Sequence, residues 1–228
     1  TMFRRRHLTS ARNNMEKEPH LTHSRIEEVF PAPKGRGLAF GGGVRLRELE
    51  AKRMEKIVEE FSRGFYFLRD FGLAASFFGS TRAKPEDRMY KETTKLASML
   101  AKEGFAVITG GGPGIMEAAN KGACEAGGRS AGINIKLLRK QSTNKYVKES
   151  AAFSYFFIRK VMLAFASEVY IFFPGGFGTL DELFELTTLI QTKKIAPIPI
   201  LLVGKEYWLP LLAWIEQELY QKRVAIAK

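Results

Sequence analysis

Histidine is scarce in this sequence of 228 residues, and its three copies, His7, His20 and His23, all lie within the first 25 residues. If the globular part begins near residue 44, that part contains no histidine. Ser–His–Asp and Cys–His catalysis are then disfavoured, as are zinc sites with histidine ligands, and we expect no metal site. Chemistry must be carried by carboxylates, arginine, lysine, hydroxyls or backbone N–H groups.

Cysteine and long apolar runs are also scarce. The single cysteine, Cys124, cannot form an intrachain disulfide and fits a reducing cytosol. No apolar run reaches the roughly 20 residues that a membrane-spanning helix needs. Even the most apolar region, 153–173, is interrupted by Arg159, Lys160 and Glu168. No hydrophobic signal-peptide core follows the N-terminal arginines. We therefore expect a cytoplasmic protein with no membrane segment.

Positive charge is abundant, with a formal net charge of +12. It is spread along the chain, and no DNA- or RNA-binding motif accompanies it, so a generally basic surface is favoured over a nucleic-acid partner. Residues 1–43 contain eight Lys or Arg against four Glu and have no helical or strand period. We expect them to form a basic, flexible extension. Binding of nucleic acid through this extension stays open as a third interpretation.

From residue 44 the pattern changes to helices alternating with strands. An amphipathic helix is expected at 44–69, where apolar residues recur at near-helical spacing. The remaining pattern predicts strands at 72–82 (ending in a turn), 105–109, 131–135, 169–173 and 197–203, with helices at 85–103, 117–126, 155–166, 183–193 and 207–220. This alternation predicts an α/β fold, a Rossmann-like doubly wound parallel sheet with helices on both faces. Residues 44–228 would form one nucleotide-binding domain.

Three glycine-containing loops follow predicted strands: 79–82, 110–114 and 175–179. Parallel sheets bind ligands beyond the carboxyl ends of their strands, so these loops are expected to meet at one site. Glycine lets the backbone approach a ligand, and a helix N-terminus attracts phosphate. The candidate phosphate-binding residues include Gly79, Ser80, Gly111 and Gly112. The Walker loop and the G-x-G-x-x-G pattern with its distant acid are both missing, which argues against P-loop ATPases and NAD enzymes.

The densest motif is Pro-Gly-Gly-Phe-Gly-Thr-Leu-Asp-Glu at 174–182. Thr179 and Glu182 have the spacing of a capping box, which would give Glu182 a purely structural role. Arg159 and Lys160 stand in an apolar helical segment. In one interpretation both side chains reach solvent. In the other, Arg159 pairs with a phosphate or with Glu182.

Together, P-G-G-x-G-T-x-x-E at 174–182, the Arg-Lys pair before it and G-G-G-x-G-I-M-E at 110–117 resemble the Lonely Guy (LOG) family. These nucleotide phosphoribohydrolases activate cytokinins and are often mislabelled lysine decarboxylases. The resemblance covers about residues 72–219. It implies hydrolysis of the N-glycosidic bond of a nucleoside 5′-monophosphate, such as AMP or a cytokinin riboside monophosphate, without a cofactor and in a homodimer. The implied catalytic pair is Arg159 and Glu182, and the implied substrate-binding residues are Gly175, Gly176, Gly178, Thr179, Lys160 and Thr188.

The chain departs from the family pattern on the base or sugar side. Leu138 and Lys140 stand where the family has a proline and an acid, and Phe157-Ile158 precedes the Arg-Lys pair where the family often has His-Glu or His-Gln. The alternative interpretation is a non-catalytic carrier of a nucleotide or of the molybdenum cofactor. The preferred base cannot be read from the residues.

Overall fold

The computed structural model describes residues 43–136 and 143–222. The predicted extension, its three histidines and Lys140 lie outside the described residues. The sheet and its helices belong to a unit that begins at Glu48, and this unit is described here by itself. Its helices are α2 (Gly43–Arg69, which starts before the unit), α3 (Arg88–Lys102), α4 (Ile115–Glu125), α5 (Phe156–Ala164), α6 (Phe177–Gln191), α7 (Lys205–Trp214) and the π-helical segment η1 (Ile215–Gln221).

Six parallel strands form one sheet in the order β4-β3-β2-β1-β5-β6. Their bounds are β1 Ala74–Phe78, β2 Ala106–Thr109, β3 Ser130–Ile135, β4 Glu149–Phe153, β5 Val169–Phe172 and β6 Ile200–Leu202. The chain builds outward from β1 to β4, then returns to the other side of β1 to form β5. The strand order therefore reverses between β1 and β5, which is where such sheets bind ligands. The predicted doubly wound, Rossmann-like fold is confirmed.

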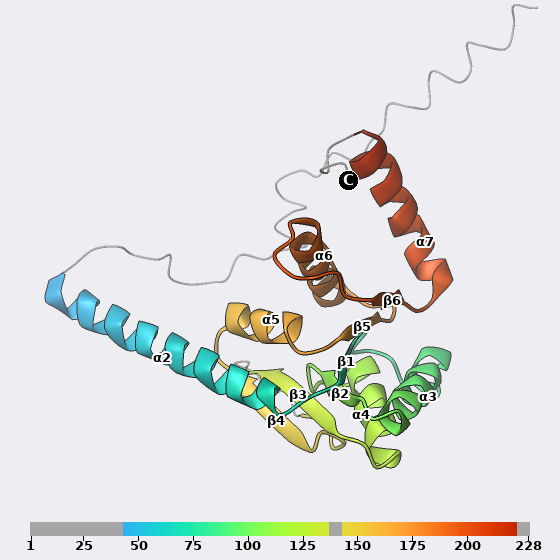
Figure 1. The fold of residues 1–228 in the computed structure, drawn as a ribbon, viewed down its shortest axis with the longest axis horizontal. Coiled ribbons are helices and arrows are strands. Elements are labelled where there is room, and N and C mark those ends of the chain that lie inside the picture. The colour runs from blue at the N-terminus through green and yellow to red at the C-terminus, as the bar shows by residue number, and fades with distance from the viewer. Residues whose placement is uncertain (1–42, 137–142, 223–228) are drawn as a thin grey trace, which may run out of the picture. The chain divides into compact units, whose positions relative to one another are not determined.

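Helices cover both faces of this sheet (Figure 1). Along β1, Ala74 and Phe78 face one apolar cluster, whereas Ala75 and Phe77 face the other, as the two-residue period of a strand requires. The first cluster includes side chains of α2, α5, α6 and α7, and the second includes side chains of α3 and α4. Because both faces are buried, the central strands are almost continuously apolar.

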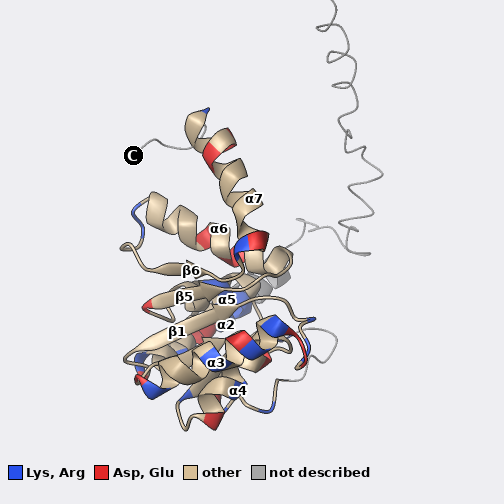
Figure 2. Ribbon diagram, turned by 90° about the vertical axis from the view of Figure 1, so that its right-hand side faces the viewer, with Lys and Arg blue, Asp and Glu red and all other residues tan. Residues whose placement is uncertain are grey.

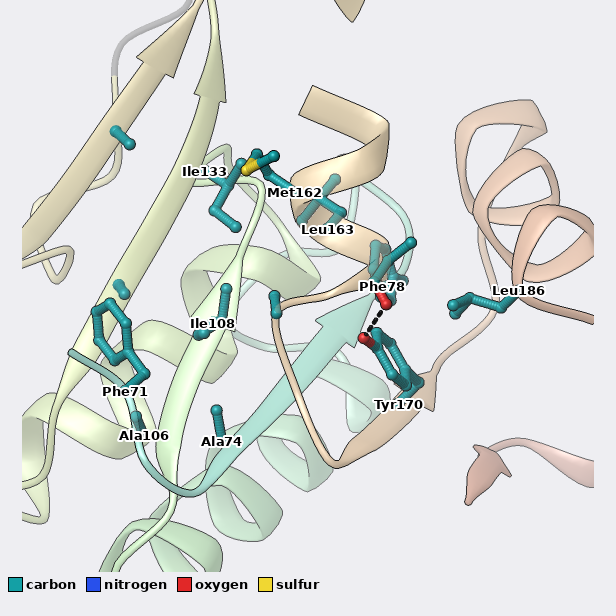
Figure 3. Packing of buried hydrophobic residues seen from close by; sticks show 14 of the residues in the cluster. Phe71, Ala74, Phe78, Ala106, Ile108, Ile133, Met162, Leu163, Tyr170 and Leu186 are labelled. Atoms are coloured by element: carbon teal, nitrogen blue, oxygen red, sulfur yellow. Dashed lines mark hydrogen bonds between the residues drawn. The ribbon is translucent and has the colours of Figure 1, made fainter. Parts of the chain in front are cut away.

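The core beside α5 is built from stacked aromatic rings at the β1–β5 junction (Figure 3). The rings of Phe78 and Phe172 lie 4.8 Å apart and nearly parallel. The buried hydroxyl of Tyr170 donates a 2.7 Å hydrogen bond to the carbonyl of Ala164 at the end of α5. This bond satisfies a polar group that would otherwise be costly to bury, and it ties α5 to the strand that leads into the 174–182 motif.

Two local predictions were wrong. The edge strand β4 was missed, because its sequence, Glu-Ser-Ala-Ala-Phe, shows no alternation of apolar and polar residues and runs into the apolar segment of α5. The capping box is also absent, since α6 begins at Phe177 with Gly176 as its N-cap and has no side-chain cap hydrogen bond. Thr179 therefore lies in the first turn of α6. Glycine is among the residues favoured at an N-cap, and a β-carbon at Gly176 would meet nothing within 4 Å, so no close contact requires the glycine here.

Lys and Arg residues are spread over several elements, and acidic residues lie among them (Figure 2). Among the described residues, no helix is both long and apolar enough to cross a bilayer. Within the same residues, no cluster of three or more His, Cys, Asp or Glu is arranged to hold a metal ion.

Candidate active site at the carboxyl ends of β1 and β5

A cavity of about 760 Å³ opens where the strand order reverses. Its walls come from the loops after β1, β2 and β5 and from the starts of α5, α6 and α7. The lining residues are Phe78–Arg82, Gly110, Met116, Phe156, Arg159, Leu163, Pro174–Thr179, Asp181, Glu182 and Tyr207. Three segments far apart in the sequence thus meet at one site, as the loop positions predicted.

The loops after β1 and β5 are joined directly. The backbone N–H of Ser80 donates a 3.0 Å hydrogen bond to the carbonyl of Pro174, and the Ser80 carbonyl accepts one from the N–H of Ile115. Side-chain space here is small, because a β-carbon at Gly79 would come within 2.7 Å of Ile115. The glycine is therefore required for the β1 loop to lie against the start of α4.

The 174–179 segment closes onto the first turn of α6. A β-carbon at Gly175 would lie 2.1 Å from the Thr179 hydroxyl, so only glycine fits there. The hydroxyl of Tyr207, from the start of α7, donates a 2.7 Å hydrogen bond to the Gly175 carbonyl. The N-terminal end of a 15-residue helix thus points at the cavity, and its dipole favours an anion such as a phosphate.

Glu182 lies one turn further along α6 and lines the cavity, yet only 8% of its surface is exposed. Burial raises the pKa of Glu182 to about 7, although Lys160 and Arg159 oppose the shift. Nearby Glu185 and Asp181 raise this pKa further. A carboxyl group with a pKa near neutrality can exchange protons at physiological pH, as a general acid or base must.

Arg159 reaches the cavity from α5. Its Nε donates a 2.8 Å hydrogen bond to the carbonyl of Ile133 in β3, and its guanidinium lies against Gly110, where a β-carbon would come within 2.4 Å of Nη2. Burial lowers the pKa of Arg159, and the charge of Glu182 raises it. Arginine remains protonated even so. The structure does not bring Arg159 and Glu182 into an ion pair; within the described part of the chain, the cation within 4 Å of Glu182 is Lys160.

The start of α5, which carries Arg159 and Lys160, is held by a buried carboxylate. Glu60 of α2 accepts hydrogen bonds of 2.9 and 3.0 Å from the backbone N–H of Ser154 and one of 3.4 Å from that of Tyr155. Burial acts to raise the pKa of Glu60, but these hydrogen bonds outweigh it and the pKa is lowered. An ionised Glu60 thus holds the backbone immediately before α5, which begins at Phe156.

A smaller cavity of about 210 Å³ adjoins the first and shares Thr81, Gly110, Met116, Phe156 and Arg159 with it. Gly111 and Gly112 line this second cavity, and Gly111 has a positive φ of 73° that suits glycine.

The glycine loop at 110–112 rests on a buried polar network centred on Asn120. The amide of Asn120 accepts hydrogen bonds from Thr109 and Asn144 and donates to Ser130 and Ala131. The Thr109 hydroxyl in turn accepts from the Gly111 N–H, and the Asn144 amide donates to the Gly112 carbonyl. The network fixes the loop by hydrogen bonds on both sides.

The structure gathers most of the predicted site residues around the first cavity: Gly79, Ser80, Arg159, Gly175, Gly176, Gly178, Thr179 and Glu182. Gly111 and Gly112 line the smaller cavity, and the other two predicted residues line neither cavity. Lys160 is directed at carboxylates of α6, and Thr188 is exposed on α6, where its carbonyl accepts hydrogen bonds from Thr192. Neither of these two side chains lines the cavity of this chain.

Sequence reasoning missed several lining residues. Phe156 and Phe177 lie at the start of their helices with 57% and 72% of their surfaces exposed, and Phe156 borders both cavities. Tyr207 follows β6, so its position after a parallel strand could have placed it at the same edge of the sheet. Phe156 and Phe177 gave no such signal, because exposed and buried phenylalanines cannot be told apart in the sequence.

The family described as "possible lysine decarboxylase" matches residues 116–227. Among curated proteins, the chain is 35% identical over 118 residues to the cytokinin riboside 5′-monophosphate phosphoribohydrolase LOG5 of Arabidopsis thaliana, covering 50% of this chain and 51% of the relative. It is 30% identical over 151 residues to LOG4 of the same plant, which bears the same enzyme name, covering 64% and 69%. The chain thus spans about half to two thirds of the length of these relatives.

Among solved structures, a molybdenum cofactor binding protein from Rippkaea orientalis is 25% identical, with a TM-score of 0.48, covering 64% of this chain and 83% of that one. The molybdenum cofactor carrier protein of Chlamydomonas reinhardtii is 21% identical, with a TM-score of 0.47, covering 68% and 99%.

Proposed function

The chain belongs to the LOG family of cytokinin riboside 5′-monophosphate phosphoribohydrolases, and we propose that it hydrolyses the N-glycosidic bond of a nucleoside 5′-monophosphate. AMP and a cytokinin riboside monophosphate are the candidate substrates, and the products are the free base and ribose 5-phosphate. The observation that carries the proposal is the cavity itself. A buried carboxyl group, an arginine and the N-terminal end of α6 line one space at the switch point of the sheet.

The phosphate side is supported by Gly175, Gly176, Gly178 and Thr179, which surround the start of α6. A 5′-phosphate placed there would face the helix dipole and the backbone, as phosphates do in other parallel sheets. Gly79 and Ser80 complete this side from the β1 loop. The guanidinium of Arg159, on the opposite wall, offers donors suited to a phosphate or a ribose hydroxyl.

The chemical step is a displacement at C1′ of the ribose. The bond from C1′ to the base nitrogen breaks, its electron pair leaves with the base, and water supplies the new oxygen on C1′. Positive charge develops on the sugar, and an ionised Glu182 stabilises it and accepts a proton from the attacking water, while the departing base nitrogen takes up a proton from solvent. A carboxyl group whose pKa is about 7 suits this role near neutral pH.

The base side is assigned to Phe156. Its ring is exposed, borders both cavities and lies beside Arg159, so it can stack on a purine. Met116 adds an apolar contact on the same side. This assignment places the phosphate at the start of α6 and the base toward the smaller cavity.

The test is to incubate the purified chain with AMP and to measure adenine and ribose 5-phosphate. Related monophosphates with other bases or with N⁶-substituted adenine would define the substrate range. We expect release by the unchanged protein and a loss of at least about 100-fold in Glu182→Gln and Arg159→Ala. Glu103→Gln is the matched control, since Glu103 is exposed at the end of α3. Nucleotide that stays bound and uncleaved, equally in Glu182→Gln, would refute hydrolysis and indicate a nucleotide carrier.

A homodimer is the second part of the proposal. Helix α5 buries Ile158 and Met162 but leaves Phe157 and Phe165 about half exposed, at 48% and 56%. Phe165 packs edge-on against Phe65 of α2, whose side chain is also exposed, so the apolar surface extends over two helices. Surfaces of this kind mark protein interfaces.

Light scattering at micromolar concentration measures the state of assembly directly. We expect a dimer, and we expect Phe157→Glu to shift it to a monomer while the exposed control Met99→Glu, on α3, does not. A monomeric unchanged protein would refute this part of the proposal.

A cytosolic location is likewise a proposal, which the lone thiol of Cys124 supports.

A further inference from the structure

We propose that Lys160, held between Asp181 and Glu185, is a positioning residue that fixes the carboxyl group of Glu182 at the cavity and governs its charge. The effect of Lys160 on the reaction rests on the proposed function, whereas its effect on Glu182 does not. It gives Lys160 a role different from the phosphate contact that the motif suggested.

The ammonium group of Lys160 lies against three acidic side chains on one face of α6. Lys160 Nζ lies 2.7 Å from Asp181 Oδ2, 2.7 Å from Glu185 Oε2 and 3.5 Å from Glu182 Oε2. The spacing of the three acids along α6 brings them to one side, because residues three and four apart are neighbours on a helix. Nζ donates a hydrogen bond to Asp181, and Glu182 and Glu185 lie within ion-pair distance of the same ammonium group.

Lys160 contacts Glu182 but is not among the residues that line the cavity. Its side chain is only 20% exposed, and Glu182 does line the cavity. A phosphate in the cavity would have to compete with three carboxylates for the ammonium group. Arg159, the preceding residue on α5, does line the cavity, as does Arg82 of the loop after β1. Arg159 is therefore placed to contact the ligand, whereas Lys160 contacts the carboxyl group of Glu182.

The charges around Glu182 act in opposite directions. Arg159 and Lys160 of α5 favour its ionised form, and Asp181 and Glu185 of α6 favour its protonated form. Lys160 is the cation within ion-pair distance of Glu182 in the described part of the chain. Of the two acids, Glu185 is the more enclosed, since its side chain is 25% exposed against 62% for Asp181, so water screens it less.

This arrangement predicts shifts of opposite sign. Lys160→Met removes the closest favourable charge and should raise the pKa of Glu182 by one or more units, because one opposite charge at this distance shifts a carboxyl pKa by about one to three units. Glu185→Gln removes a like charge and should lower the same pKa. Lys160→Arg keeps the charge and should leave the pKa close to that of the unchanged protein.

The experiment is an NMR titration of the full chain labelled with ¹³C at the glutamate side-chain carboxyl, with the Glu182 signal identified by its loss in Glu182→Gln. Opposite shifts in Lys160→Met and Glu185→Gln, with recovery in Lys160→Arg, support the proposal. No shift, or shifts of the same sign, overturn it. If Lys160→Met does not fold, Lys160→Gln is titrated in its place, because it also removes the positive charge and should also raise the pKa of Glu182.

The pH dependence of AMP hydrolysis in the same variants tests the link to the reaction. Its midpoint should move with the pKa of Glu182 in each variant. If the unchanged protein releases no adenine, the proposed function fails while the titration still decides the role of Lys160. Hydrolysis with a midpoint that does not follow the titration would refute the link and leave the activity established.

Discussion

Replacing Glu182 with Gln is expected to stabilise the folded protein at pH 8 and to change its stability much less at pH 5. The reason is that the cavity holds Glu182 in an environment that disfavours its charge. Its pKa is raised from the ordinary value of 4.5 to about 7 in the folded protein. Glutamine keeps the shape of the protonated side chain and removes the charge. Lys160 would keep its partners Asp181 and Glu185, so no cation is left unpaired.

The magnitude follows from linkage between protonation and folding. Between pH 4.5 and 7 the folded state binds a proton that the unfolded state has released, so stability falls as pH rises through this window and is constant above it. A shift of this size corresponds to about 3 kcal/mol at pH 8 and to less than about 1 kcal/mol at pH 5. We therefore expect Glu182→Gln to gain about 2–3 kcal/mol at pH 8 relative to its effect at pH 5.

Urea unfolding at the two pH values, followed by circular dichroism, measures this difference. Each variant is compared with the unchanged protein at the same pH, so the titration of all other groups cancels. Glu103→Gln, exposed on α3, should show no such dependence. An equal effect of Glu182→Gln at both pH values, or a loss of stability that grows with pH, would refute the claim that burial controls the charge of Glu182.

Three further outcomes are expected. The rate of AMP hydrolysis should rise with pH through a midpoint near 7, because the ionised form of Glu182 is the active one; a rate that falls through this range would contradict the assignment. Gly175→Ala should destabilise the fold by about 1–3 kcal/mol, since its β-carbon meets Thr179. Gly178 lies inside α6 and a β-carbon there meets nothing within 4 Å, so Gly178→Ala should stabilise the fold by about 0.5–1 kcal/mol. Urea unfolding of the two variants checks the sign of each change. Asn120→Ala should lower stability by about 3 kcal/mol in the same assay, because it leaves several buried partners unsatisfied; an effect below about 1 kcal/mol would show that the network is dispensable.

The alternation of apolar strands with amphipathic helices was enough to predict the doubly wound sheet, since strands buried on both faces read as short continuous apolar runs. It missed the edge strand β4, whose sequence Glu-Ser-Ala-Ala-Phe is neither a continuous apolar run nor a clear alternation. It also placed the start of α6 too late. A threonine and a glutamate three residues apart satisfy the capping-box pattern, but the backbone at Gly176 had already begun the helix.

The meeting of the glycine loops could be predicted because parallel strands carry their carboxyl ends to one edge, and that rule needs only the order of elements. The partners of charged side chains could not. Arg159 and Lys160 are adjacent in the chain, yet one contacts Ile133 and lines the cavity while the other is enclosed by acids of α6. Which way each points depends on the rotation of α5 against the sheet and on its distance from α6. The sequence by itself determined the sheet, the loops and the kinds of charge at the site; only packing decided the pairing and burial that raise the pKa of Glu182.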